Sequence, residues 1–158
     1  MQLGLKALML GGLLAAGAAQ AADSINGQHF GDWGGACDSK LCYIQQALSS
    51  KGQLLMATAI GYLPGKPVPA VLIQLPKGAQ LKEGVLLQVD NNAAIKFEGK
   101  CEKDSCFAGF ALDQKMQQQF QQGSKAVVSF IPAPKQKPVS LPLSLKGIGK
   151  GLSALPKS

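Results

Sequence analysis

The chemistry of this sequence is concentrated in its four cysteines. They form two pairs of equal spacing, Cys37 with Cys42 and Cys101 with Cys106, and each pair encloses four residues that are mostly polar. Four thiolates with short intervals within each pair could bind zinc, but such sites belong mainly to reducing compartments. Disulfide bonding is the alternative, and the export signal described below favours it.

Four cysteines allow three disulfide connectivities. A four-residue insert can close as a β-turn and bring the flanking Cα atoms to the roughly 4.4–6.8 Å that a disulfide needs. We therefore predict two local bridges, Cys37 to Cys42 and Cys101 to Cys106, each at the end of a hairpin. So short a ring contributes only about 2 kcal/mol in the chain-entropy model, so these bridges do not hold the whole fold together.

Enzyme chemistry has few residues to use. His29 is the sole histidine, no serine lies in a Gly-x-Ser-x-Gly turn, and paired cysteines leave no thiol nucleophile. We expect His29 to be a partly exposed polar residue beside the first strand. The acidic pairs, Asp32 with Asp38 and Glu102 with Asp104, suit hairpins and turns better than acid–base catalysis. We expect no enzyme, no metal site and no cofactor.

The N-terminal residues are typical of an export signal. Residues 1–21 carry Lys6 as their only charge, then an apolar run from 7 to 16, then Ala19-Gln20-Ala21 as a small-x-small cleavage site. A retained membrane anchor is the alternative, but the apolar run is shorter than the about 20 residues that span a bilayer. We predict a cleaved signal peptide at 1–21 and a single domain at 22–158 without a transmembrane segment. We expect the mature protein to be periplasmic, or else secreted or associated with the outer envelope.

The charged residues of the chain limit the classes of partner that it can bind. All 16 basic residues are lysines, so the planar guanidinium that reads guanine edges is missing and no specific nucleic-acid recognition is expected. No acidic residue follows Asp113. The lysines in this basic third could contact an anionic surface or polysaccharide, although they would equally keep an exported domain soluble. The candidate contacts are Lys125, Lys135, Lys137, Lys146 and Lys150.

Short extended runs separated by turn residues dominate the rest of the chain. Residues 139–145 alternate with a period of two. Because proline cannot donate to a ladder, Pro142 either places this strand at a sheet edge or is turned away from the neighbouring strand. Residues 85–90 and 95–98 alternate in the same way and predict a hairpin. Both patterns are typical of strands with one buried face.

Two runs, 54–62 and 68–75, are apolar on both faces and predict central strands. Trp33 lies just before the first cysteine pair, and we expect it to fill the core rather than to bind a ligand. About nine strands result when the weaker patterns are included. These weaker patterns lie at 29–33, 42–48, 106–110 and 125–130.

A short surface helix is predicted between Asp113, an N-cap type, and Gly123, a helix-ending residue. Its apolar stripe consists of Leu112, Met116 and Phe120, spaced four residues apart. The helix should pack on the sheets through this stripe.

The C-terminal segment spaces Ile148, Leu152 and Leu155 three or four residues apart. Its three glycines each cost about 1 kcal/mol of helix propensity, so the segment would not be helical alone. We expect it to pack as a short helix or turn against an open end of the sandwich, with Lys146 and Lys150 in solvent.

Several short motifs occur together in a fixed order along the mature chain. They are Phe30-Gly31-Asp32-Trp33 before Cys37, Cys42-Tyr43-Ile44-Gln45-Gln46, Leu75-Pro76-Lys77-Gly78 with Leu81 and Gly84-Val85, Phe97 before the second cysteine pair, and Leu143-Ser144-Leu145-Lys146-Gly147. This set of motifs resembles the invasion-associated locus B family of exported bacterial proteins, and the resemblance covers most of the mature chain. It departs near the end, where Ile148 and three glycines replace an expected aromatic residue and alanine-rich helix.

The resemblance implies an immunoglobulin-like β-sandwich in the periplasm or envelope, with a link to host-cell entry in some members. Together with the residue patterns it predicts a mainly β fold of about nine strands, one short surface helix and a C-terminal turn or helix. We expect a non-enzymatic adaptor or binding module linked to host-cell invasion or association, whose partner is an unknown protein or envelope component. The alternative is a periplasmic envelope-stress or structural accessory that binds anionic lipopolysaccharide or peptidoglycan, and a hydrolase is a distant third.

Overall fold

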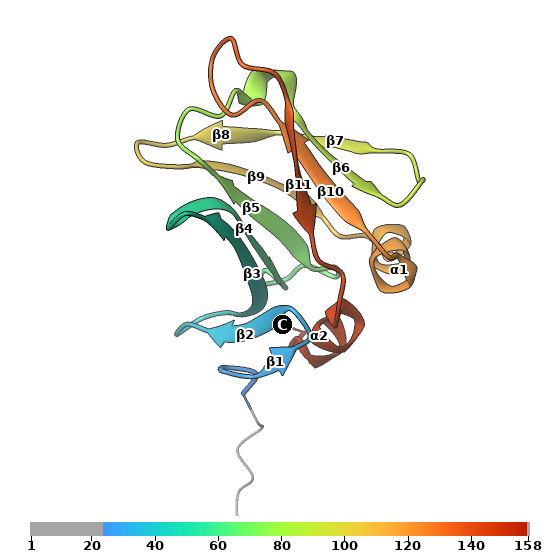
Figure 1. The fold of residues 1–158 in the computed structure, drawn as a ribbon. Helices are drawn as coiled ribbons and strands as arrows, with labels where there is room; N and C mark the ends of the chain where they lie inside the picture. Colours follow the sequence, from blue (N-terminus) through green and yellow to red (C-terminus); the bar gives the residue numbers. More distant parts are fainter. Residues whose placement is uncertain (1–23, 158) are drawn as a thin grey trace, which may run out of the picture.

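The computed structural model describes residues 24–157, and the predicted signal peptide at 1–21 lies outside them. Two antiparallel β-sheets pack face to face, with helices α1 and α2 toward one end (Figure 1). The seven-stranded sheet has the order β1-β2-β3-β4-β5-β9-β8, and the four-stranded sheet has the order β11-β10-β6-β7. The predicted mainly β sandwich with two helical segments is therefore confirmed.

The bounds of the elements follow the predicted runs closely. The seven-stranded sheet consists of β1 (His29–Phe30), β2 (Trp33–Cys37), β3 (Cys42–Ser50), β4 (Gln53–Gly61), β5 (Ala70–Leu75), β9 (Cys106–Ala111) and β8 (Gly99–Cys101). The four-stranded sheet consists of β11 (Val139–Leu143), β10 (Ala126–Phe130), β6 (Val85–Val89) and β7 (Ile95–Phe97). The helices are η1 (Leu81–Glu83), α1 (Gln114–Gln122) and α2 (Ile148–Ala154).

Period-two alternation builds the core between the sheets. In β6, Val85, Leu87 and Val89 are buried while the residues between them are exposed. The seven-stranded sheet faces them with side chains such as Ile44 and Ile73, both fully buried. The predicted 85–90/95–98 hairpin is β6 with β7, and β11 is an edge strand, which is one of the two arrangements that Pro142 allows.

The described residues form eleven strands, so the expected nine was too few. The run 29–33 is not one strand but parts of β1 and β2, joined by a tight turn at Gly31-Asp32. Strand β8 was not predicted because Gly99-Lys100-Cys101 carries no apolar alternation. It exists because it pairs with β9 next to the second disulfide, so tertiary pairing overrides its weak local signal.

Both helical predictions are confirmed. The Asp113 carboxylate caps α1 by accepting the backbone N–H of Met116 at 2.8 Å, and Met116 and Phe120 are buried. In the C-terminal segment Ile148 and Leu152 are buried, and their burial outweighs the weak helix propensity of the glycines. The lysines of this segment lie in solvent.

Candidate functional site

The motif residues at the two ends of the chain meet in one inter-sheet cluster, formed by Asp32, Trp33, Gln46 and Ser144. The carbonyl oxygen of Ser144 accepts two hydrogen bonds, from Trp33 Nε1 at 3.0 Å and from Gln46 Nε2 at 2.9 Å. The Ser144 N–H in turn donates to Gln46 Oε1 at 3.0 Å. These bonds join the seven-stranded sheet to the segment that leaves β11.

Further side-chain and backbone contacts join the residues of this cluster. The Ser144 hydroxyl donates to Asp32 Oδ2 at 2.6 Å, and the Asp32 N–H donates to the Lys146 carbonyl at 3.1 Å. Gly147 has a φ of +83°, and a Cβ there would overlap the carbonyl of Phe30. Trp33 is fully buried, which confirms its expected place in the core. The contacts of this cluster therefore stabilise the fold.

The candidate chemical residues are not gathered into a catalytic arrangement. His29 lies exposed on β1, where it is paired with Gly34. Among residues 24–157 no group of three or more histidine, cysteine or acidic side chains could hold a metal ion. Asp38 is held instead by its own turn, where its carboxylate accepts the backbone N–H groups of Lys40 and Leu41 at 2.8 Å each. These two hydrogen bonds hold the pKa of the Asp38 carboxyl below its ordinary value.

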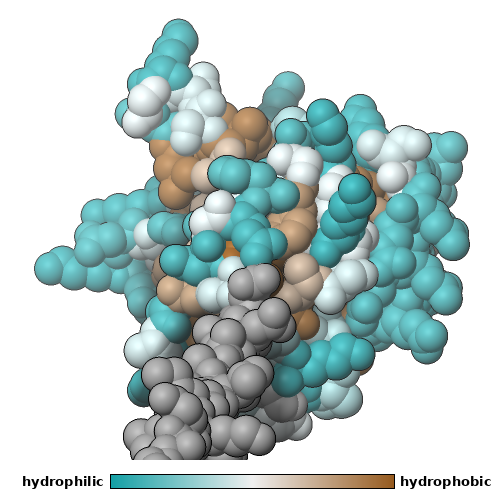
Figure 2. Space-filling view, turned by 90° about the horizontal axis from the view of Figure 1, so that it is seen from below, coloured by the Kyte–Doolittle hydropathy of each residue, from teal (hydrophilic) through white to brown (hydrophobic). Residues whose placement is uncertain are grey.

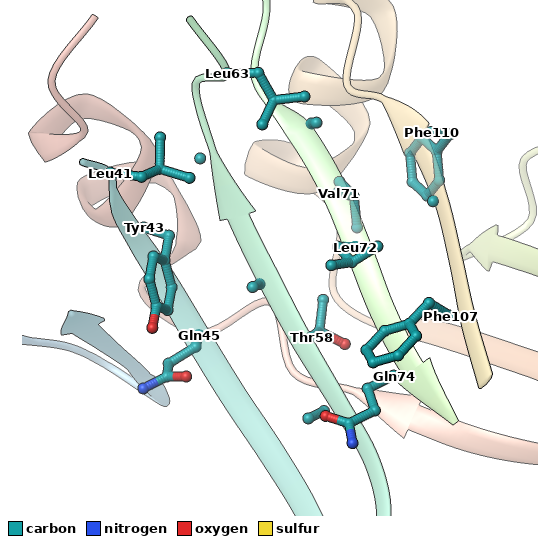
Figure 3. A pocket seen from close by; sticks show the side chains of 15 residues that line it. Leu41, Tyr43, Gln45, Thr58, Leu63, Val71, Leu72, Gln74, Phe107 and Phe110 are labelled. Atoms are coloured by element: carbon teal, nitrogen blue, oxygen red, sulfur yellow. The ribbon is translucent and has the colours of Figure 1, made fainter. Parts of the chain in front are cut away.

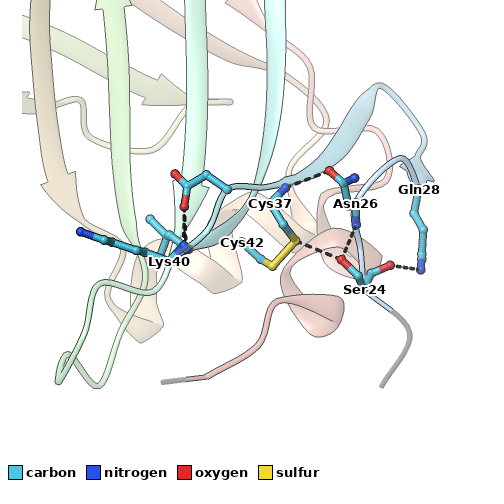
Figure 4. The surroundings of a disulfide bond; sticks show 8 residues. Ser24, Asn26, Gln28, Cys37, Lys40 and Cys42 are labelled. Atoms are coloured by element: carbon cyan, nitrogen blue, oxygen red, sulfur yellow. Dashed lines mark hydrogen bonds between the residues drawn. A yellow bond between two sulfur atoms is a disulfide. The ribbon is translucent and has the colours of Figure 1, made fainter. Parts of the chain in front are cut away.

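The cysteines form the two local disulfides Cys37–Cys42 and Cys101–Cys106, which leave no free thiol. Their Cα atoms are 4.0 Å and 3.9 Å apart, closer than the expected range, and each pair lies directly opposite across an antiparallel ladder. Near the first bridge, Ser24 Oγ lies 3.2 Å from Cys37 Sγ, and Asn26 Oδ1 accepts the Cys37 N–H at 3.0 Å (Figure 4). This disulfide therefore also anchors the first described residues.

The fold separates the lysines of the predicted anionic contact. Lys135 and Lys137 lie in the β10–β11 connection, at the end of the molecule opposite α2 (Figure 1). Lys125 precedes β10 at the other end, about 17 Å away along a five-residue strand. Its backbone N–H donates to the Asp90 carboxylate at 2.9 Å, so a negative charge lies next to it.

Lys146 and Lys150 accompany α2 at the same end as Lys125. Figure 2 views the molecule from this end, and its surface shows hydrophilic side chains around the margin with hydrophobic ones nearer the centre. Because Lys135 and Lys137 lie at the opposite end of the molecule, the five predicted lysines form no single continuous patch.

A groove on the outer face of the seven-stranded sheet was not predicted as a site. It has a volume of about 570 Å³ and runs along β4 between side chains of β3, β5 and β9 (Figure 3). None of the residues that line it is charged. We name it the outer-face groove. Its main side chains are Tyr43, Gln45, Ala57, Ala59, Leu63, Leu72, Gln74 and Phe107.

The strand register explains why this face is hollow. Strand β4 turns Met56, Thr58 and Ile60 into the core, so the intervening small residues Ala57 and Ala59 form the floor of the groove. Ala59 lies directly between Gln45 of β3 and Leu72 of β5, so larger side chains border a floor of methyl groups.

The walls of the groove expose apolar surface to solvent. Leu72, on strand β5, is 49% exposed, and Leu63, in the connection after β4, is 45% exposed. At the far wall, Phe107 pairs with Gln74 in the ladder. Gln74 donates to Ser105 Oγ at 3.0 Å, which holds its side chain beside the groove. The result is an open, uncharged and largely apolar surface.

A sequence signal for the groove existed in the two runs that are apolar on both faces. These runs, 54–62 and 68–75, are indeed the central strands β4 and β5. In an antiparallel sandwich one face of each strand meets the core and the other normally meets water, so a second apolar face needs a partner. The second face of these strands is the floor and wall of the groove.

Comparison with known proteins agrees with the motif resemblance. The family model of the invasion associated locus B (IalB) protein matches residues 33–156, which includes most of the inter-sheet cluster and all of the groove. The chain belongs to the IalB family. No curated protein matches it.

The IalB fold is also seen in a solved structure. The crystal structure of invasion associated protein b from Bartonella henselae superposes with a TM-score of 0.70 at 21% identity, covering 80% of this chain and 92% of that one. A protein of unknown function from Burkholderia pseudomallei K96243 gives a TM-score of 0.39 at 13% identity, over 60% and 59% of the two chains. The first likeness supports the sandwich fold. No helix within residues 24–157 is long and apolar enough to cross a membrane.

Proposed function

We propose that this IalB-family member is a non-enzymatic adaptor or binding module of the periplasm or cell exterior, linked to host-cell invasion or association. Its recognition surface is the outer-face groove. The observation that carries this proposal is the open, uncharged apolar face of β4 and β5, which the fold itself does not cover. Exposed apolar patches rimmed by polar residues mark interaction sites on soluble domains.

The groove suits an extended, uncharged polypeptide segment of a partner protein. Apolar side chains of such a segment would pack on Ala57, Ala59 and Leu72, and its backbone would meet the amide side chains of Gln45 and Gln74. These amides offer both donors and acceptors, which a peptide backbone can satisfy. A charged segment would have to leave water without a partner of opposite charge in the groove, which is costly.

A matched pair of variants tests this role. Ala59→Trp fills the floor of the groove, whereas Leu86→Trp changes an exposed side chain, 42% accessible, on the outer face of the four-stranded sheet. We expect the first variant to lose association with the partner or host cell and the second to keep it, while both melt like wild type. Unchanged association of a well-folded Ala59→Trp protein would contradict the proposal.

The second candidate is an envelope accessory that binds anionic lipopolysaccharide or peptidoglycan. Its support is the lysine-only basic charge, with no acidic residue after Asp113. The two candidates differ in salt dependence, because electrostatic binding weakens steeply as ionic strength rises whereas apolar contact does not. Binding that survives physiological salt favours the adaptor, and binding that is lost there favours the accessory.

A further inference from the structure

A second hollow lies where the chain crosses from the four-stranded to the seven-stranded sheet. It has a volume of about 550 Å³ and is bordered by η1, β7 and β8. Each of these elements contributes one lysine to its lining: Lys82, Lys96 and Lys100 respectively. The sequence does not reveal this group, because only the packing of β8 against η1 brings Lys82 next to the other two.

The side chain of Lys96 passes over a glycine. Gly84 has a φ of +84°, and a Cβ there would overlap the Lys96 side chain at Cε. The aliphatic stem of Lys96 therefore lies along the bare backbone just after η1.

The lining of this hollow carries a net positive charge. Glu98 is the one acidic residue in its lining, against three lysines, so the formal charge of the lining is +2. None of these three lysines forms an ion pair with another described residue. Three positive charges that share a single negative one still repel one another, and a bound anion would relieve that repulsion.

We propose that this lysine hollow binds a phosphate group, either as a phosphomonoester on a glycan or lipid headgroup or as the free anion. A phosphomonoester carries about −1.5 to −2 charges at neutral pH, which matches the charge of the lining. Lysines act as point charges that can approach a tetrahedral oxyanion from several sides. A planar carboxylate is better matched by the two-pronged guanidinium of arginine, which the chain lacks.

The test titrates inorganic phosphate into the full chain at low ionic strength and follows the backbone amide resonances. We expect saturable shifts confined to residues 80–84 and 96–101. The triple variant Lys82→Gln, Lys96→Gln, Lys100→Gln should lose at least ten-fold in affinity. A control triple that removes the same charge elsewhere, Lys66→Gln, Lys115→Gln, Lys157→Gln, should stay within two-fold of wild type.

Equal losses in the two triple variants would overturn the site, since they would show that only net charge attracts the anion. Shifts spread over all surface lysines, or binding that does not saturate, would also overturn it. Glucose 1-phosphate distinguishes the sources: tighter binding than inorganic phosphate supports a glycan-borne group, and equal binding supports the free anion. Ala59→Trp should bind phosphate like wild type. The test of the lysine hollow is therefore independent of the test of the outer-face groove.

Discussion

The inter-sheet cluster and the outer-face groove differ in how far their side chains are buried or hydrogen-bonded within the fold. In the cluster, Trp33, Gln46 and Ser144 satisfy one another across 98 to 111 residues of sequence. In the groove, Leu72 and Leu63 remain about half exposed. Motif residues from both ends of the chain meet in the cluster. Many of the residues that match the family motifs therefore serve to hold the two sheets together. The groove is the surface that we propose for a partner.

The largest expected effect is on stability, and it distinguishes an aromatic residue of the cluster from an aromatic residue of the groove. Trp33→Ala removes a fully buried ring and its hydrogen bond, so the free energy of unfolding should fall by about 3–5 kcal/mol. Phe107→Ala, in the groove wall, should cost less stability but weaken partner binding. Denaturant unfolding and a binding assay on both variants measure the difference. A Trp33→Ala protein that melted like wild type yet lost its partner would place the tryptophan on a binding face.

The next effect concerns the polar bonds of the cluster. Gln46→Leu keeps a similar volume but leaves the Ser144 N–H without its partner and its carbonyl with one donor fewer. We expect a loss of about 1–3 kcal/mol in unfolding free energy, because a partly buried polar group left unpaired is costly. Gln45→Leu, the adjacent residue on the groove side, is the matched control and should change stability by less than about 0.5 kcal/mol. Similar losses in both variants would argue against a special role of the cluster.

Thr58 lies between the two regions, on the core side of β4 beneath the groove floor. Among the described residues its hydroxyl is the buried side-chain polar group without a hydrogen-bond partner. Thr58→Val removes this unpaired group at nearly constant shape and should raise the unfolding free energy by about 1 kcal/mol. Binding should not change. A clear destabilisation would show that the hydroxyl has a role in the core.

The smallest expected effect lies at the first disulfide turn. The folded-state pKa of Asp38 is lowered by two backbone N–H donors, so its stabilising contribution is present above the unfolded-state pKa of about 3.9 and is lost as the pH falls through the folded-state value. Asp38→Asn should therefore lower the melting temperature slightly at neutral pH. In acid the melting temperatures of variant and wild type should converge. A difference that did not change with pH would assign the effect to turn geometry instead of charge.

Much of the fold was predictable because its signals are local. The period-two runs of β6, β7 and β11, the caps of α1 and the stripe of α2 each depend on residues close in sequence. Strand β8 and the turn between β1 and β2 escaped prediction because pairing with distant segments, not local pattern, creates them. The lysine hollow escaped for the same reason.

The candidate site was harder to predict, although part of its signal was present. The double-faced apolar character of 54–62 and 68–75 indicated central strands, but pattern alone cannot say whether the second face meets a helix, another sheet or a partner. The small floor residues carry no chemical signal of their own. Only the register that places Ala59 between Gln45 and Leu72 turns them into a groove.

Site-specific photocrosslinking tests the central claim most directly. A photoreactive residue would replace Ala59 in the groove floor or, as the control, Leu86 on the opposite outer face, each in the full chain expressed in intact cells. The groove model predicts a discrete protein adduct from position 59 that Leu72→Glu prevents, and no such adduct from position 86. Equal adducts from both positions, or an adduct from 86 alone, would contradict the assignment of recognition to the outer-face groove.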